Sequence, residues 1–283
     1  MTAAASAMSL PRSMARRFRL LPGSARAGVI IITAIVALGL LVPILSPYDL
    51  YEQVGKANAA PTFEHPFGLD SLGRDIVTRS FGAVRIDIVV AIVGVMIPLL
   101  IGTVVGGLAG TTDLRVVRGG VGLLVDGINA FPFLILALGV IAVIGTGAQA
   151  MIIAIAFTSW ARYAKLARTR AAVLRDLDFV SALRLLGYSR ARITVRHILP
   201  NCFSETVAYG VSDFTLVILT VAALSFLGAG VRPPEPEWGS MMADGRIYLQ
   251  SAPWILVGPG IVLTITAFGV SLIGEALKDR SRG

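Results

Sequence analysis

The sequence predicts an all-α membrane protein with six transmembrane helices. Apolar residues make up 55% of the chain and charged residues only 15%, and the mean hydropathy is +0.78. Soluble domains have about 25% charged residues. A hydrocarbon core about 30 Å thick is spanned by about 20 apolar residues in a helix. Six segments reach or approach this length: Ala27–Leu45, Ile86–Ala109, Gly119–Ile144, Ala148–Ala164, Thr206–Gly230 and Pro253–Leu277.

The basic residues predict the orientation of these segments. With the N-terminus inside, nineteen of the 25 Lys and Arg residues fall on the cytosolic side. Because positively charged loops remain cytosolic, both termini are predicted to be cytosolic, including the basic tail 1–26 and the tail 278–283. The net charge of +8 therefore reflects membrane topology and does not indicate a nucleic-acid partner.

The first transmembrane helix, residues 27–45, is expected to be an uncleaved signal anchor. Its apolar run is long, and no small-residue cleavage site follows it before Pro47. Residues 46–85 are polar and rich in turn residues, which predicts an external loop. Residues 86–277 then form the transmembrane core.

The second segment carries small residues toward its cytosolic end, among them Gly102, Gly106 and Gly110. Small residues let helices approach closely in lipid. This face is therefore predicted to pack against another helix of the same chain, with a seam to a second subunit as the alternative.

Two acidic residues lie inside predicted spans, Asp126 in the third and Asp213 in the fifth. An ionisable side chain in a span is costly and is a candidate for function. Both residues are therefore candidates for lining a translocation path, with structural pairing to a backbone group or an arginine as the alternative. The pair Phe131-Pro132 that follows Asp126 is expected to break or bend the helix.

A basic elbow, residues 175–200, connects the fourth and fifth segments. Gly187 can adopt the left-handed conformation that ends a helix, and Ser189 can cap the next one. Pro200 is expected to end that second short helix, because the residue before a proline avoids the α region. A basic helical elbow between spans could dock a soluble partner or could be only a solvated loop.

The elbow resembles the Glu-Ala-Ala loop of ABC importer permeases. The matching residues are Ser181-Ala182-Leu183, Gly187 and the closing Ile198-Leu199-Pro200, although Ser181 stands where that family has the acidic residue. In the family this loop forms the coupling helix, which sits in a groove of the cytosolic ATPase. The resemblance implies that the ATPase-coupling residues are Ser181, Ala182, Leu183, Gly187, Ser189, Ile193, Leu199 and Pro200.

Two other stretches resemble the dipeptide/oligopeptide branch of these permeases. One reads His-Pro-Phe-Gly-Leu-Asp-Ser-Leu-Gly-Arg-Asp and ends at Asp75; the other begins Leu-Ser-Phe-Leu-Gly-Ala-Gly at Leu224 and continues to Pro-Glu-Trp-Gly. Without the resemblance, the first stretch could simply be a set of tight turns. The resemblance implies that the candidates for docking a binding protein are Asp70, Gly73, Arg74, Asp75, Glu237 and Trp238.

The resemblance covers the chain from about residue 65 to residue 277 and implies a type I ABC importer permease fold in the cytoplasmic membrane of a prokaryote. The implied partners are a homologous permease subunit, one or two ABC ATPases, an extracytoplasmic solute-binding protein and membrane lipid. No cofactor is expected in this chain, because ATP and Mg would bind to the ATPases. The implied cargo is a di- or oligopeptide, with a nickel complex or another small solute as the alternative.

Function classes other than transport find little support. The chain has no G-x-x-x-x-G-K-[ST] loop, so it is not expected to bind ATP in the P-loop way. Its two histidines are predicted on opposite faces of the membrane, which excludes a metal site built on a histidine pair. Its single cysteine cannot form an internal disulfide. An intramembrane aspartyl hydrolase would need Asp126 and Asp213 to face each other, and neither has the Gly-x-Gly-Asp context. A passive channel or a membrane scaffold remains the alternative of another class.

Overall fold

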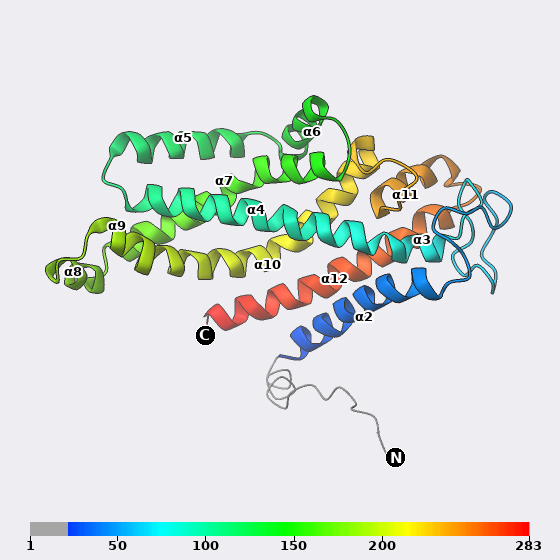
Figure 1. The fold of residues 1–283 in the computed structure, drawn as a ribbon, viewed down its shortest axis with the longest axis horizontal. Helices are drawn as coiled ribbons and strands as arrows, with labels where there is room; N and C mark the ends of the chain where they lie inside the picture. Colours follow the sequence, from blue (N-terminus) through cyan, green and yellow to red (C-terminus); the bar gives the residue numbers. More distant parts are fainter. Residues whose placement is uncertain (1–21, 283) are drawn as a thin grey trace, which may run out of the picture.

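The computed structural model describes residues 22–282, and that part of the chain is helical apart from its loops and one isolated bridge between Leu69 and Asp75 (Figure 1). Most of the predicted tail 1–26 lies outside the described residues. The helices are α2 Gly23–Leu45, α3 Ile76–Gly82, α4 Val84–Thr111, α5 Arg115–Ala130, α6 Phe133–Ile144, α7 Ala148–Arg175, α8 Asp178–Leu185, α9 Arg190–Ile193, α10 Leu199–Leu224, α11 Trp238–Gly245 and α12 Trp254–Arg282.

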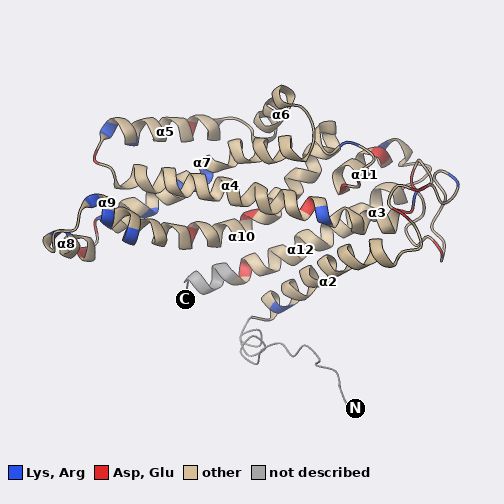
Figure 2. Ribbon diagram, in the orientation of Figure 1, with Lys and Arg blue, Asp and Glu red and all other residues tan. Residues whose placement is uncertain are grey.

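Helices α4, α7 and α10 run through the middle of the bundle (Figure 1). Helix α5 lies beside α7 on one side, with α6 turned across it and packed on α7, and α2 and α12 pack together on the other side. The short helices α8 and α9 lie at one end, which we call the elbow end. Helices α3 and α11 and the loop before α3 lie at the opposite end, which we call the cap end. Charged residues gather at these two ends, and the middle of the bundle has few (Figure 2).

Glycines allow α4 and α7 to pack closely together. A Cβ atom at Gly102 would lie 2.5 Å from the carbonyl oxygen of Trp160, and a Cβ atom at Gly106 would overlap the backbone of Ala164. Backbone-to-backbone packing of this kind requires residues without side chains. The small-residue face of the second predicted span therefore packs within this chain, as predicted.

Four helical stretches in the described chain are long and apolar enough to cross a membrane, and a fifth results if α5 and α6 form one broken span. Helix α7 has 28 residues, or about 42 Å at 1.5 Å per residue, but its second half is rich in basic residues. The predicted total of six spans thus stays a prediction, as does the cytosolic position of both termini.

The third predicted span, residues 119–144, is not one straight helix. The chain bends by 96° between α5 and α6, and Pro132 occupies the N-cap position of α6. Proline tolerates a helix start because it has no N–H group to leave unbonded. The expected break at Phe131-Pro132 is confirmed, and it divides the segment into two helices.

The prediction that Pro200 ends a helix is wrong. The chain passes from α9 through a π-helical turn, Thr194–Ile198, directly into α10, and Pro200 lies in the first turn of α10. Proline normally clashes with the carbonyl group four residues earlier. We attribute its tolerance here to the wider π turn, which changes the hydrogen-bond register just before Pro200.

The loop predicted over residues 46–85 is shorter than expected, because α3 occupies Ile76–Gly82. Asp75 caps this helix: its carboxylate accepts hydrogen bonds from the backbone N–H and the hydroxyl of Thr78, both at 2.8 Å. An aspartate at the N-cap satisfies a backbone donor that would otherwise lack a partner. The polar sequence therefore includes a short capped helix that leads into α4.

Candidate functional site

The elbow, residues 175–200, is fastened to the bundle by a small hydrophobic core of its own. Val180, Ile193 and Ile198 pack there with residues of α7 and with Cys202 of α10. Asp113, which precedes α5, forms ion pairs with Arg190 and with Arg175, the latter at 3.6 Å. The elbow is therefore coupled to both α7 and α10 and does not hang from the bundle as a loose loop.

The two local features predicted within the elbow are confirmed. Gly187 has φ = +82°, and its N–H donates to the carbonyl of Arg184 at 3.0 Å, which closes the end of α8. The Ser189 hydroxyl accepts from the N–H of Arg192 at 3.3 Å and caps α9. These contacts fix the angle between the two short helices.

The predicted coupling residues separate into two groups by exposure. Ser181, Ala182, Gly187, Ser189 and Pro200 are exposed, whereas Ile193 and Leu199 are buried and Leu183 packs against the elbow core. The exposed group can contact a partner. The buried group can only support the elbow from beneath.

Two apolar residues at the tip of the elbow were not among the predicted coupling residues. Leu185 is 91% exposed and Leu186 is 74% exposed, at the end of α8. Exposed leucines at a helix tip indicate an interaction surface when they lie beyond the lipid-facing part of a bundle. Their position directly before Gly187 was a signal in the sequence that could have identified them.

A polar groove runs along α7 on the side that α5 covers. Its larger part is a cavity of about 850 Å³ between α5 and α7, and its smaller part has a volume of about 450 Å³. Thr169 lines both parts, so they meet along α7. The groove residues that carry charged or polar side chains are Arg115, Arg118, Asp126, Asn129, Arg162, Lys165, Arg168, Thr169, Arg175 and Tyr209.

The two predicted acidic residues are not brought together as a pair. Asp126 is exposed on α5 and lines the larger cavity. Asp213 is buried, accepts a hydrogen bond from the Tyr163 hydroxyl at 2.9 Å and lies 3.4 Å from Arg162. Asp213 therefore holds Arg162 at the groove, which is the structural pairing considered as an alternative, whereas Asp126 faces the groove directly.

At the cap end, the predicted docking residues of the first motif are mostly buried and bonded to one another. Asp70 accepts from Arg74 Nε at 2.7 Å and lies 3.5 Å from Arg79 Nε. Asp75, besides capping α3, lies 3.0 Å from His65 Nδ1. Gly73 has φ = +74° and closes the turn between Asp70 and Arg74. Within this motif the charged side chains hold the loop in shape.

The second motif is buried as well. Glu237 caps α11 by accepting from the N–H groups of Gly239 and Ser240 at 2.9 and 2.8 Å. Trp238 donates its indole N–H to the carbonyl of Ser80 at 2.8 Å and its backbone N–H to Asp87 at 3.2 Å. Direct docking by these residues stays a prediction, and in this structure they support the surface around them.

Asp87 is a buried residue of the cap end that the sequence interpretation missed. It is fully buried in the first turn of α4, next to Glu237, and links α4 to α11 through Trp238. An aspartate within an apolar segment was the available signal. Its contact with α11 could not be predicted, because 151 residues separate Asp87 from Trp238.

Comparison with protein families matches residues 79–282 to the family described as "Binding-protein-dependent transport system inner membrane component". The match covers more than half of the chain, including the elbow, the groove and α11. The predicted family is thereby confirmed.

Curated relatives agree with this match. The chain is 35% identical to a dipeptide transport system permease of Alkalihalophilus pseudofirmus, over 89% of this chain and 83% of that protein. It is 35% identical to a di/tripeptide transport system permease of Pseudomonas aeruginosa, over 90% and 86%. It is also 35% identical to a glutathione transport system permease of Escherichia coli, over 93% and 87%.

Among solved structures, an inward-facing form of the MetNI methionine ABC transporter has a similar fold. The TM-score is 0.54 at 19% sequence identity, over 71% of this chain and 94% of that one. This similarity confirms the predicted importer permease fold. The chain belongs to the family of inner-membrane components of binding-protein-dependent transport systems.

Proposed function

We propose that this chain is one permease subunit of an ATP-driven importer of small peptides, and that the elbow transmits the movement of a partner ATPase to α7 and α10. The peptide cargo is supported by three relatives whose names specify dipeptides, di- and tripeptides, and glutathione. A nickel complex or another small solute is the alternative cargo, and the transport measurement below distinguishes them.

The observation that carries this proposal is the combination of an exposed apolar tip and a rigid base in the elbow. Leu185 and Leu186 project from the end of α8, while Val180 and Ile193 anchor the elbow to α7 and α10. A partner that moves the tip would move the ends of two long helices with it. Rigid-body displacement of this kind is how domain closure becomes a change in helix packing.

The polar groove supports the proposal of a translocation path. Charged residues such as Asp126 and Arg168 would be costly against lipid, so the side of the bundle formed by α5 and α7 must face water or another protein. One chain leaves this groove open along its length. A homologous permease subunit facing it would close the path, and Asp213 would act indirectly by holding Arg162 at the wall.

We assign ATP and Mg to one or two partner ATPases at the elbow end, so that this chain catalyses no reaction itself. The binding protein would dock at the cap end, on the surface that the buried Asp70, Arg74 and Glu237 support. This arrangement places ATP hydrolysis at the elbow end of the bundle and cargo delivery at the cap end.

The experiment is to measure ATPase binding to the purified permease carrying Leu185→Asp, and then dipeptide uptake and ATP hydrolysis by the full transporter reconstituted in liposomes with its binding protein. Burying a leucine side chain contributes about 2 kcal/mol, which corresponds to more than tenfold in affinity. We therefore expect at least about a tenfold loss of affinity between the permease and the ATPase and a matching loss of uptake.

Leu249→Asp is the matched control, because Leu249 is also an exposed leucine but follows α11 at the cap end. This variant should keep ATPase binding, because Leu249 lies at the opposite end of the bundle from the elbow. Normal ATPase binding by Leu185→Asp would contradict the role of the elbow tip. Uptake of nickel complexes but of no peptide by the unaltered transporter would contradict the peptide cargo.

A further inference from the structure

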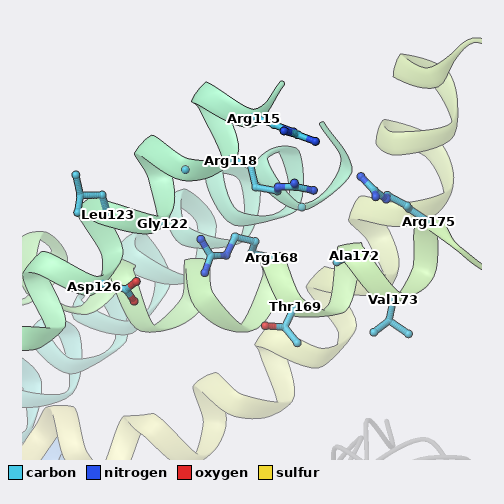
Figure 3. Close-up of a pocket in the computed structure, with 12 residues that line it drawn as sticks. Arg115, Arg118, Gly122, Leu123, Asp126, Arg168, Thr169, Ala172, Val173 and Arg175 are labelled. Carbon is cyan, nitrogen blue, oxygen red and sulfur yellow. The ribbon is translucent and has the colours of Figure 1, made fainter. Parts of the chain in front are cut away.

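The larger cavity of the groove combines four arginines with one aspartate. Arg115 and Arg118 come from the first turn of α5, Arg168 and Arg175 come from the second half of α7, and Asp126 lies near the other end of α5. Figure 3 shows Asp126 at one end of the cavity, Arg115, Arg118 and Arg175 toward the other, and Arg168 between them. The cavity is therefore basic at one end and acidic at the other.

Among the described residues, most of these charged side chains take part in no ion pair. In the part of the chain that the structure describes, neither Asp126 nor any of Arg115, Arg118 and Arg168 takes part in an ion pair. Arg175 is paired with Asp113 and Asp176, but its Nη1 atom is buried without a hydrogen-bond partner among the described residues. Closely spaced like charges without partners repel one another, so the basic end favours an anion.

The backbone adds to this preference. Arg115 and Arg118 lie at the N-terminus of α5, where no side chain caps the helix. The helix dipole places partial positive charge at that end, so basic residues there are unfavourable by themselves. A bound anion would relieve both the repulsion between arginines and the unfavourable dipole.

The axial spacing of these positions along α5 is comparable to the length of a short peptide. A Cβ atom at Gly122 would lie 2.5 Å from Arg168 Nη1. The guanidinium of Arg168 therefore lies directly over Gly122. Asp126 is one helical turn beyond Gly122, about 6 Å along the axis, and Arg118 is about 12 Å from Asp126 along the axis. The span of an extended dipeptide is about 7 Å, and that of a tripeptide is about 10 Å.

We infer that this cavity binds the cargo on its way through the permease; this inference rests on the proposed transport of peptides. Asp126 binds the terminal ammonium group, and Arg168, with Arg118 for longer peptides, binds the terminal carboxylate. Arginine suits the second role because its planar fork can donate two hydrogen bonds to one carboxylate. A cavity of about 850 Å³ is within the range of small-molecule sites.

A zwitterionic lipid headgroup has similar chemistry, but the position of the cavity favours a peptide. The cavity continues at Thr169 into the second part of the polar groove. The surface formed by α2, α4, α10 and α12 is different, because its cavity of about 410 Å³ is lined only by apolar side chains and glycine. That apolar side suits lipid, whereas the polar side suits a water-filled path.

The test measures binding of the dipeptide Ala-Ala to the purified nucleotide-free permease–ATPase complex, without the binding protein, by equilibrium dialysis. The same complexes are tested with N-acetyl-Ala-Ala and with Ala-Ala amide. The unaltered complex should prefer the free dipeptide at least about tenfold over either blocked form, because each blocked form loses one charge-assisted contact. Arg168→Gln should weaken Ala-Ala binding and abolish the preference over the amide, whereas Asp126→Asn should abolish only the preference over the acetylated form.

Arg170→Gln is the matched control. Arg170 lies two residues from Arg168 on α7, does not line the cavity and is paired with Glu205, so its substitution should leave binding and both preferences unchanged. Each variant's uptake in the complete system, with the binding protein, is measured in parallel.

Three outcomes would overturn the inference: no dipeptide binding to the unaltered complex, equal binding of the free and blocked dipeptides, or preferences that survive in both variants. A phospholipid that co-purifies in an Arg168-dependent way and is not displaced by Ala-Ala would assign the cavity to lipid instead. If peptide uptake by the unaltered system persists in any of these cases, the inference fails while the proposed function stands. If that system takes up no peptide, the proposed function itself fails.

Discussion

Individual carboxylates hold the cap end together by capping the N-termini of helices and by pairing with arginines. Asp75 caps α3, Glu237 caps α11, and Asp70 bonds to Arg74. Such residues satisfy backbone donors that have no partner inside a helix. Their side chains point into the protein, although the motifs that contain them suggest a surface for a partner. A single sequence identifies the residue types but does not show which way each side chain faces.

Glu237→Ala should lower the stability of the cap end. The substitution removes two hydrogen bonds to the N-terminus of α11, where loss of a cap costs about 1–2 kcal/mol. We expect a lower unfolding temperature in detergent, measured by the fluorescence of the tryptophans. Glu235→Ala is the control, because Glu235 is exposed and, among the described residues, its side chain accepts a hydrogen bond from the Tyr51 hydroxyl alone. Equal unfolding temperatures for the two variants would contradict a structural role for Glu237.

At the scale of helices, the sequence predicted the ends that depend on local chemistry. The left-handed Gly187, the cap at Ser189 and the break at Phe131-Pro132 are all present. Pro200 was misjudged because its tolerance depends on a π turn, which is a change of register that local propensity does not reveal.

The polar groove could be predicted only in part. Asp126 and Asp213 were identified as costly charges within apolar segments, but the sequence could not tell which of them faces the groove. That difference depends on the rotation of α5 and α10 against α7, and on Tyr163, which bonds to Asp213 at 2.9 Å. Arg168 is one of the nineteen basic residues assigned to the cytosolic side, and nothing in the sequence distinguishes it from the others, because basic residues at the cytosolic edge of a span are common.

Gly106→Ala should weaken the packing of α4 on α7. Its new methyl group would overlap the backbone of Ala164, and overpacking of this kind costs about 1–3 kcal/mol. Gly139→Ala in α6 is the matched control, because no atom lies within 4 Å of the added Cβ there. We expect thermal unfolding in detergent to occur at lower temperature for Gly106→Ala only. The control should be neutral or slightly stabilised, since alanine favours helix over glycine.

A small effect of Gly106→Ala, no larger than that of Gly139→Ala, would mean that α4 and α7 can separate without loss. The close contact between these helices would then not be a fixed part of the bundle.

At the scale of the whole molecule, the two sides of the bundle differ in polarity. The side formed by α2 and α12 presents an apolar cavity, and the side formed by α5 and α7 presents a charged groove. A membrane protein with one apolar side and one polar side is complete only when the polar side meets water or a partner. The groove ends near the elbow. There Asp113, just before α5, pairs with Arg175 of α7 and with Arg190 of α9. Movement of the elbow can therefore change the groove directly.

Gly187→Val should uncouple ATP hydrolysis from transport. Gly187 has φ = +82° and open space around it, so valine would meet no neighbour there but would strain the backbone by about 1–2 kcal/mol. The strain would be relieved by a change in the angle between α8 and α9, which shifts the tip of the elbow relative to α7 and α10. We expect the reconstituted transporter to retain ATP hydrolysis and to lose most of its peptide uptake, while the transmembrane bundle stays folded.

Gly187→Asn separates the effect of the backbone conformation from the effect of adding a side chain. Asparagine adds a side chain to the same open space but adopts the left-handed conformation more readily than other residues do. It should therefore keep the elbow angle and retain uptake close to that of the unaltered chain. Equal loss of uptake in the two variants would show that the surface of Gly187 matters, and normal uptake in Gly187→Val would show that the elbow angle does not control transport.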